Sequence, residues 1–137
     1  MSQPLVTSKQ ISDFLKDAYC EIKPKIPVII DYPSEDARVS YGVYIDGINV
    51  VSRTVQQESM TFCGRVYEVT DQFRVLFVSI QNDKKAPQVE DAIHSLVNQL
   101  FFDGYQEITY EVDESFGSRG NLKEYTFTLT RLDTSQL

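Results

Sequence analysis

The chain has 137 residues, and 20 acidic against 13 basic side chains give it a formal net charge of −7 at pH 7. A hydrophobic content of 42%, with eight Phe and eight Tyr, excludes wholesale disorder, and six Gly, five Pro and two Cys are too few for a collagen-like or disulfide-scaffold protein. The negative charge argues against a protein that grips the phosphates of nucleic acid, and the length favours one domain over residues 1–137.

The N-terminal residues Met1–Val6 carry neither the basic region nor the long apolar run of a signal peptide. No apolar run approaches the roughly 20 residues that a membrane-spanning helix needs. Cys20 and Cys63 form no CxxC pair and have no His at ligand spacing. We therefore expect no export signal, no membrane association and two reduced thiols.

The first predicted element is a helix over Thr7–Ile22. Thr7 and Gln10 have the spacing of a capping box, and Val6 and Ile11 have that of a hydrophobic staple. Two prolines follow the helix and end it, because proline removes a backbone donor. The apolar positions that recur at helical spacing are Ile11, Phe14, Leu15, Ala18, Tyr19 and Ile22.

A strand-rich segment comes next and begins with a short strand at Val28–Asp31. Apolar and polar residues then alternate over Val39–Ile45, which is the period of a half-buried strand. The following Asp46-Gly47 predicts a type I′ hairpin turn, with a return strand over Ile48–Arg53. Residues Thr54–Ser59 are polar, and either a loop or an extension of the strand fits them.

A second hairpin is predicted between Thr61–Val69 and Phe73–Ile80, with its turn at Thr70-Asp71-Gln72. Its second strand carries apolar side chains on both faces, which is typical of a central strand. One face has Phe73, Val75 and Phe77, and the other has Leu76, Val78 and Ile80.

The last third contains a second helix and a closing hairpin. Apolar residues at helical spacing predict the helix over Pro87–Phe102, and Gly104 is expected as the left-handed residue that ends it. Two alternating segments then predict a hairpin over Tyr105–Leu132 with a mobile tip at Glu114–Asn121. The tail Thr134–Leu137 is expected to fray.

The element order predicts an α+β domain with a mostly antiparallel sheet of about five to seven strands and two amphipathic helices packed on one face. Two helices cover one face only, so the other apolar face needs either a sheet that folds over on itself or a neighbouring subunit. If a subunit covers it, we expect the interface to include Cys20, Leu76, Val78 and Ile80.

No catalytic or metal-binding motif is present. His94 has no Ser, Cys or Asp at a recognised catalytic spacing, which favours a surface-boundary residue over a general base, and Cys63 is better interpreted as a core thiol than as a nucleophile. Glu107 and Glu111 share one strand face by the two-residue period. With Asp113 and Glu114 they lack the spacing of a calcium loop. We therefore expect a solvated acidic strand and no enzyme activity, metal or cofactor.

The layout resembles the small tail-terminator or neck (head-tail completion) proteins of tailed bacteriophages. The resemblance lies in the capped helix at Thr7–Ile22, the strand-rich middle with Asp46-Gly47, the helix at Pro87–Phe102 and the hairpin at Tyr105–Leu132. It implies a non-enzymatic virion protein of the tail or neck, assembled in the host cytoplasm. Such a protein forms a ring, usually a hexamer, that caps the tail tube and docks it to the head connector, while DNA passes through without specific binding.

The surplus of apolar side chains on the sheet suits lateral packing of subunits in a ring, and the negative charge lets DNA slide past without adsorbing. Exposed loops are expected to dock against tube or connector subunits. The residues expected in these partner-docking loops are Arg53, Gln56, Gln57, Glu58, Ser115, Phe116 and Arg119.

Two other classes of function fit the composition. An acidic intracellular binding module, such as an adaptor or immunity protein, would cover a basic partner with its acidic surface and would be a monomer or dimer. A small enzyme with an unrecognised site is the third alternative.

Overall fold

The computed structural model describes residues 3–19, 26–33, 40–55, 64–79, 86–117 and 120–136. They form two helices and six strands, in agreement with the expected α+β fold. In chain order the elements are α1 (Ser8–Ala18), β1 (Val28–Ile29), β2 (Gly42–Ile45), β3 (Asn49–Val55), β4 (Gly64–Ser79), α2 (Ala86–Phe102), β5 (Glu107–Gly117) and β6 (Gly120–Gln136).

All six strands belong to one sheet with the order β1-β2-β4-β6-β5, and β3 pairs with β4 as well. Each pair is antiparallel except β1 with β2. The long strands β4 and β6 pair over their full length, from Gly64 opposite Gln136 to Ser79 opposite Asn121. They form the axis of the sheet.

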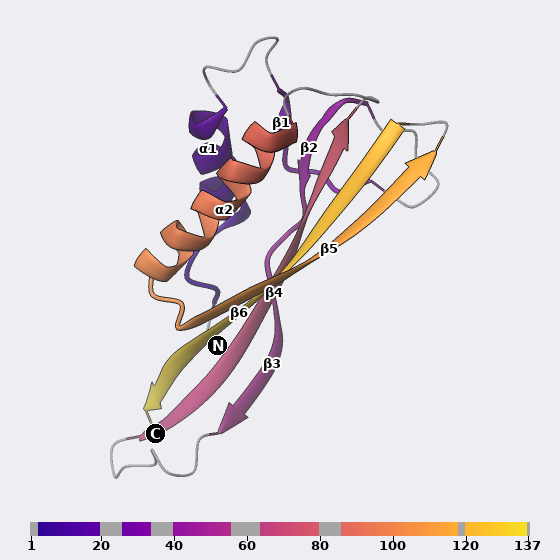
Figure 1. The fold of residues 1–137 in the computed structure, drawn as a ribbon. Coiled ribbons are helices and arrows are strands. Elements are labelled where there is room, and N and C mark those ends of the chain that lie inside the picture. Colours follow the sequence, from indigo (N-terminus) through magenta and orange to yellow (C-terminus); the bar gives the residue numbers. More distant parts are fainter. Residues whose placement is uncertain are drawn as a thin grey trace.

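The helices cover one face of one half of the sheet, and the other half projects beyond them (Figure 1). We call this projecting half the β arm. It comprises β3, residues Gly64–Thr70 of β4 and residues Thr130–Gln136 of β6. The β arm ends near the C-terminus of the chain, at the lower end of Figure 1.

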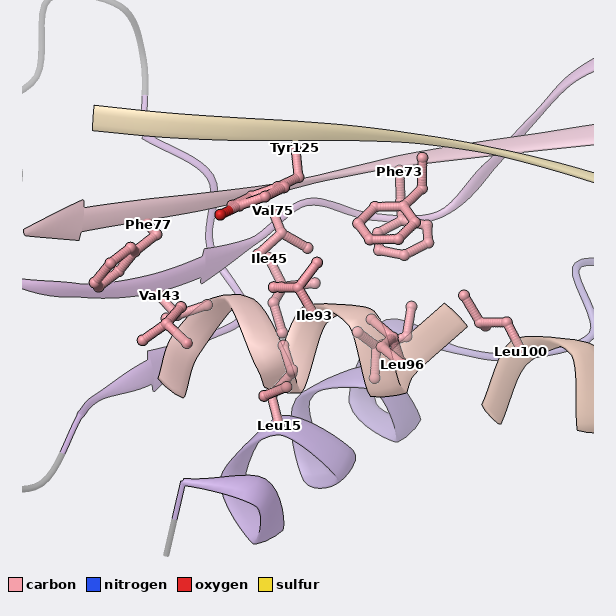
Figure 2. Close-up of a cluster of buried hydrophobic side chains, with 14 of the residues drawn as sticks. Leu15, Val43, Ile45, Phe73, Val75, Phe77, Ile93, Leu96, Leu100 and Tyr125 are labelled. Carbon is pink, nitrogen blue, oxygen red and sulfur yellow. The ribbon is translucent and has the colours of Figure 1, made fainter. Parts of the chain in front are cut away.

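The core lies between the helices and the sheet face that they cover (Figure 2). Apolar side chains of α2 point at the sheet, and Leu15 of α1 closes the layer from the side (Figure 2). Phe73 and Phe127 stack there with their ring centroids 4.6 Å apart. The buried side chains of this core include Leu15, Val43, Ile45, Phe73, Val75, Phe77, Ile93, Leu96, Leu100, Tyr125, Phe127 and Leu129.

The start of α1 is as expected, but its end comes earlier. Thr7 and Gln10 form both hydrogen bonds of a capping box, and this satisfies backbone N–H groups that a helix start leaves unpaired. The helix ends at Ala18 rather than near Ile22. The next residue, Tyr19, leaves the helical conformation with ψ of 3°, and its buried hydroxyl donates to the Val89 carbonyl of α2.

The end of α2 agrees with the expected glycine cap. Gly104 has a φ of 116°, its N–H donates to the Phe101 carbonyl, and the Tyr105 N–H donates to the Leu100 carbonyl. These two bonds define a Schellman motif, which satisfies the last carbonyls of the helix. A Cβ at Gly104 would lie 3.3 Å from Leu5 Cδ1, so the site favours glycine for two reasons.

The prediction of a type I′ hairpin at Asp46-Gly47 is wrong. β2 and β3 do not pair with each other; both pair with β4, one after the other along its edge. Gly47 is not among the described glycines with positive φ. The Asp46 carboxylate instead accepts from the Gly47 N–H and from Arg74 Nε, which ties this short break in the strand to β4.

The prediction of a turn at Thr70-Asp71-Gln72 is also wrong, because these residues lie within the unbroken strand β4. Asp71 is fully buried, and its carboxylate accepts hydrogen bonds from Tyr105 and Arg131. Asp71 is therefore paired inside the sheet with Arg131 of β6, and the polar tripeptide forms strand rather than an exposed turn. β4 counts as one strand where the sequence analysis expected two.

The closing hairpin is longer than expected at both ends. β5 continues to Gly117 and β6 starts at Gly120, so most of the expected tip over Glu114–Asn121 is paired backbone. Part of the expected frayed tail also pairs, since β6 runs to Gln136 opposite Gly64. Backbone pairing in the sheet extends these ends beyond what the side-chain alternation indicates.

The core predicts a contrast between two apolar residues of α2. Leu96 is buried against the sheet, so Leu96→Ala should lower the free energy of unfolding by about 2–5 kcal/mol. Phe102 is 87% exposed, so Phe102→Ala should change it by less than about 0.5 kcal/mol. Urea denaturation followed by circular dichroism measures both values, and similar losses in the two variants would contradict this packing.

Candidate interaction surfaces

Two of the residues expected at a subunit interface lie in a small apolar cluster on the sheet face away from the helices. Leu76 and Val78 are buried there together with Tyr44. Tyr32 and Leu122 pack against the cluster, so the chain itself supplies part of its cover. The other two residues, Cys20 and Ile80, lie outside the described part of the chain.

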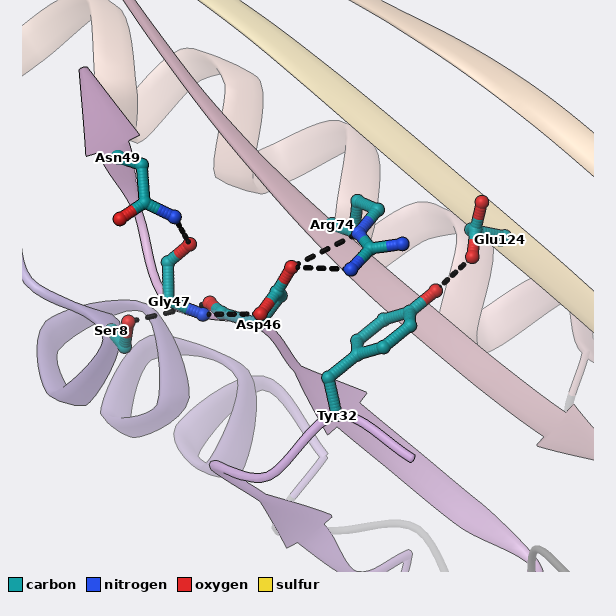
Figure 3. Close-up of polar contacts among 7 residues, drawn as sticks. All are labelled: Ser8, Tyr32, Asp46, Gly47, Asn49, Arg74 and Glu124. Atoms are coloured by element: carbon teal, nitrogen blue, oxygen red, sulfur yellow. Dashed lines mark hydrogen bonds and ion pairs between the residues drawn. The ribbon is translucent and has the colours of Figure 1, made fainter. Parts of the chain in front are cut away.

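A polar network holds the Tyr32 segment over this face (Figure 3). The Tyr32 hydroxyl donates to Glu124 of β6, and the Arg74 guanidinium lies 4.2 Å from the Tyr32 ring centroid. Arg74 Nη2 is also 2.8 Å from Asp46 Oδ2. Burial, helped by the bond to Glu124, raises the pKa of Tyr32, which keeps its hydroxyl protonated and able to donate.

The part of this face that β5 forms is polar and acidic. Glu107 and Glu111 are exposed and lie on the same side of β5, opposite Thr130 and Thr126 of β6, as the two-residue period predicted. Asp113 continues this row. We call Glu107, Glu111 and Asp113 the acidic row; they are three negative charges on a strand at the edge of the sheet.

Glu114 does not belong to the acidic row. It faces the helix side of the sheet, where its carboxylate lies 3.3 Å from Lys123 Nζ. Lys123 also contacts Glu90 of α2, and the hydrogen bond from Lys123 to Glu90 is the main cause that raises the pKa of Lys123. These contacts join α2 to the closing hairpin.

The β arm exposes apolar side chains. Val50, Val51 and Val55 of β3 and Leu132 of β6 are 37–52% exposed. No described helix lies over either face of the arm (Figure 1). The β arm therefore presents aliphatic side chains to its surroundings on a thin, one-layer sheet.

Arg53, one of the expected docking residues, lies in β3 on the β arm rather than in a loop. Its guanidinium lies 3.9 Å from the Tyr67 ring centroid and 3.8 Å from Asp133 Oδ2. Ser115 and Phe116 lie in β5 and pair with β6. The remaining expected docking residues, Gln56, Gln57, Glu58 and Arg119, lie outside the described part of the chain.

A buried ion pair lies where the helix-covered half of the sheet meets the β arm. Arg131 Nε and Nη2 lie 2.7 Å and 3.3 Å from the two Asp71 carboxylate oxygens, and the Tyr105 hydroxyl donates to Asp71 over 2.6 Å. The Leu5 N–H in turn donates to the Tyr105 hydroxyl. Asp71 and Arg131 are 0% and 2% exposed, so the pair is isolated from water.

This ion pair was not among the expected sites, although the sequence contains one signal for it. Arg131 continues the alternation of Tyr125, Phe127 and Leu129, which places it on the core face of β6. A charge on a core face needs a buried partner of opposite sign. The partner Asp71 is harder to find, because the polar tripeptide Thr70-Asp71-Gln72 has the composition of a turn.

The chemical candidates show no catalytic arrangement among the described residues. His94 is exposed, and its Nδ1 lies 3.4 Å from the Tyr110 hydroxyl. Cys63 lies outside the described residues. In the described part of the chain, no group of three or more His, Cys, Asp or Glu side chains could hold a metal ion. Within the same ranges, no helix is both long enough and apolar enough to span a membrane.

Comparison of the sequence with protein-family models gave no match. A comparison with curated proteins gave none either.

The buried ion pair predicts an asymmetry between single and double substitutions. Arg131→Met leaves the Asp71 carboxylate buried without its cation and should cost about 3–5 kcal/mol of unfolding free energy. Adding Asp71→Leu removes the unpaired charge, so the double variant should regain much of the loss. Urea denaturation checks this, and a double variant less stable than Arg131→Met would contradict it.

The buried tyrosines predict a loss of stability at alkaline pH. Burial raises the pKa of Tyr19, Tyr32, Tyr105 and Tyr125 above the ordinary value of 10.0, and the Asp71 carboxylate adds to this at Tyr105. Their contribution to stability is complete below about pH 10, where the unfolded chain also keeps its phenols protonated. It is lost as pH rises above that value, because the unfolded chain then releases protons that the folded chain retains.

Urea denaturation between about pH 8 and about pH 11 measures this loss. Tyr105→Phe removes one of the titrating groups and should make the loss less steep. A free energy of unfolding that stays constant across this range would contradict the prediction.

Proposed function

We propose that the protein is a structural subunit of a phage virion, of the tail-terminator kind, which forms a homo-oligomeric ring between the tail tube and the head connector. The type of protein comes from the resemblance of its element order. The observation that carries the proposal is the β arm, whose exposed aliphatic side chains no described helix covers.

The β arm is a poor candidate for independent stability. Three strands in one layer need an apolar face for independent stability, and the apolar side chains of the β arm stay exposed in the single chain. Full burial of an aliphatic side chain contributes about 1.5–3 kcal/mol. Since Val50, Val51, Val55 and Leu132 are each about half exposed, covering them in an assembly would contribute a few kcal/mol per copy.

The acidic row supports the same function in a different way. Glu107, Glu111 and Asp113 are exposed on the sheet face away from the helices. Negative side chains repel the phosphates of a passing duplex, so a ring with this face toward its lumen lets DNA slide without adsorbing. This orientation is part of the proposal.

The acidic row also favours one alternative, an acidic binding module that covers a basic partner protein. The two functions differ in the size of the free protein. The module would be a monomer or dimer, whereas the ring subunit forms a much larger species.

Light scattering coupled to gel filtration, with negative-stain imaging of the largest species, tests the ring. The wild-type chain should form rings with a mass several times the 15.7 kDa of one chain. Val55→Asp places a charge on the β arm and should shift the protein toward the monomer. The matched control is Ile29→Asp, since Ile29 has a similar exposure of 39% but lies in β1, away from the β arm.

A strict monomer at high concentration that also fails to bind tail tubes or connectors would overturn the proposal. Rings that survive Val55→Asp unchanged would show that the β arm is not the assembly surface. A dimer as the largest species would favour the acidic binding module.

A further inference from the structure

The described sheet has an open edge on each side: β5 forms one, and β3 and the two-residue strand β1 form the other. β5 ends the strand order on one side, and its 11 residues pair with β6 only. On the other side, the seven residues of β3 pair with β4 only. No strand of the described residues pairs with the outer edge of either. Alternate N–H and C=O groups of such edges point outward and can pair with a further strand.

Both edges carry apolar side chains on the helix side of the sheet and polar side chains on the other side, with Arg53 of β3 as the charged exception on the helix side. On β5, Ile108, Tyr110 and Val112 face the helix side of the sheet, and the acidic row faces the other side. On β3, Val55 lies opposite Tyr67 on the helix side. Arg53, opposite Val69, shares the helix side with Val55, whereas Ser52 and Thr54 point to the other side.

If the two strands paired with matching faces, Arg53 and Val55 of β3 would face the apolar side chains of β5 on the helix side, and polar side chains would meet on the other side. The exposed Val55 would pack against those apolar side chains of β5. Ser52 and Thr54 would lie beside the acidic row, where hydroxyl groups can donate to carboxylates.

Charge distinguishes between the possible pairs of edges. Pairing β5 with β5 would bring two acidic rows together, and like charges opposite each other destabilise a strand pair. β3 carries no acidic residue, no Lys and no Pro, and its one charged residue is Arg53. The bulge between Val50 and Ser52 is the one feature of β3 that weakens an edge, and with no acidic residue β3 does not repel β5 as a second copy of β5 would.

We propose that β3 of one copy adds to the outer edge of β5 of the next copy, so that neighbouring subunits form one continuous sheet. This contact joins two different surfaces of the chain, and such a contact generates rings when the rotation closes. The proposal rests on the proposed function, since it names the contact that builds the ring.

The register of the sheet predicts how successive copies are displaced. The middle of β5, Val112, lies level with Val75 of β4 through Tyr125, whereas the middle of β3, Ser52, lies level with Thr70. The two edges are thus five residues apart along β4, or roughly 17 Å. Because matching faces need an even displacement, copies joined at these edges are staggered by four or six residues, or roughly 14–20 Å, and a closed sheet of tilted strands requires such a stagger.

Disulfide trapping between separately purified variants tests the contact. One variant carries Ser52→Cys, and the other carries Thr109→Cys, Glu111→Cys or Asp113→Cys, which all face the same side of β5. Paired strands bring opposite Cα atoms within the range that a disulfide spans. Position 52 lies on tryptic peptide 39–53 and β5 on peptide 86–119, whereas Cys20 and Cys63 lie on other peptides, so mass spectrometry identifies the link.

The link should form when unlike variants are mixed and should be absent from each variant alone. The matched control replaces the β5 cysteine by Val112→Cys, which faces the other side of the sheet and should lose the link. Circular dichroism verifies that each variant is folded, and all five positions are exposed.

Each negative outcome identifies what fails. Rings that show no link from position 52 to β5 overturn this contact but leave the proposed function intact. A link within the Ser52→Cys variant alone shows a symmetric β3 contact and overturns the proposal as well. A monomer without a link at any concentration overturns both the contact and the ring.

Discussion

The full-length pairing of β4 with β6 is the constraint on which the rest of the structure depends. β4 has 16 residues and spans about 53 Å, whereas the 17 residues of α2 span about 26 Å. The helices therefore cover only about half of the strand pair. The uncovered half becomes the β arm, so the arm is a consequence of strand length, and its apolar side chains remain exposed on the isolated chain (Figure 1).

The ion pair of Asp71 and Arg131 lies at the boundary that this length difference creates. On the covered side, the stacked rings of Phe73 and Phe127 continue the core. Slipping β6 against β4 by one residue would turn every core side chain to the wrong face and separate the two charges. The buried pair therefore contributes to the choice of register, in addition to the small net stability that such pairs provide.

The sequence predicts those parts of the fold that local patterns determine. The capping box at Thr7, the helical stripe of α2 and the glycine at 104 all appear where expected, because neighbouring residues suffice to specify them. The two hairpins fail because distant partners decide those positions. Asp46 binds Arg74 and Asp71 binds Arg131, and a turn prediction contains no information about either partner. Of the candidate surfaces, the strand period locates the acidic row, whereas the β arm depends on pairing between distant segments.

The acidic row and the β arm together explain how one chain can have open edges without pairing at random. An edge with three like charges repels a copy of itself, and an edge with valines and one arginine does not repel the acidic one. In the proposed contact, the charges therefore favour β3 against β5 over β5 against β5. In the proposed ring, the net charge of −7 adds a general repulsion between copies, and the negative charge on β5 disfavours a contact between two β5 edges. Directional contacts of this kind are the ones from which closed rings are built.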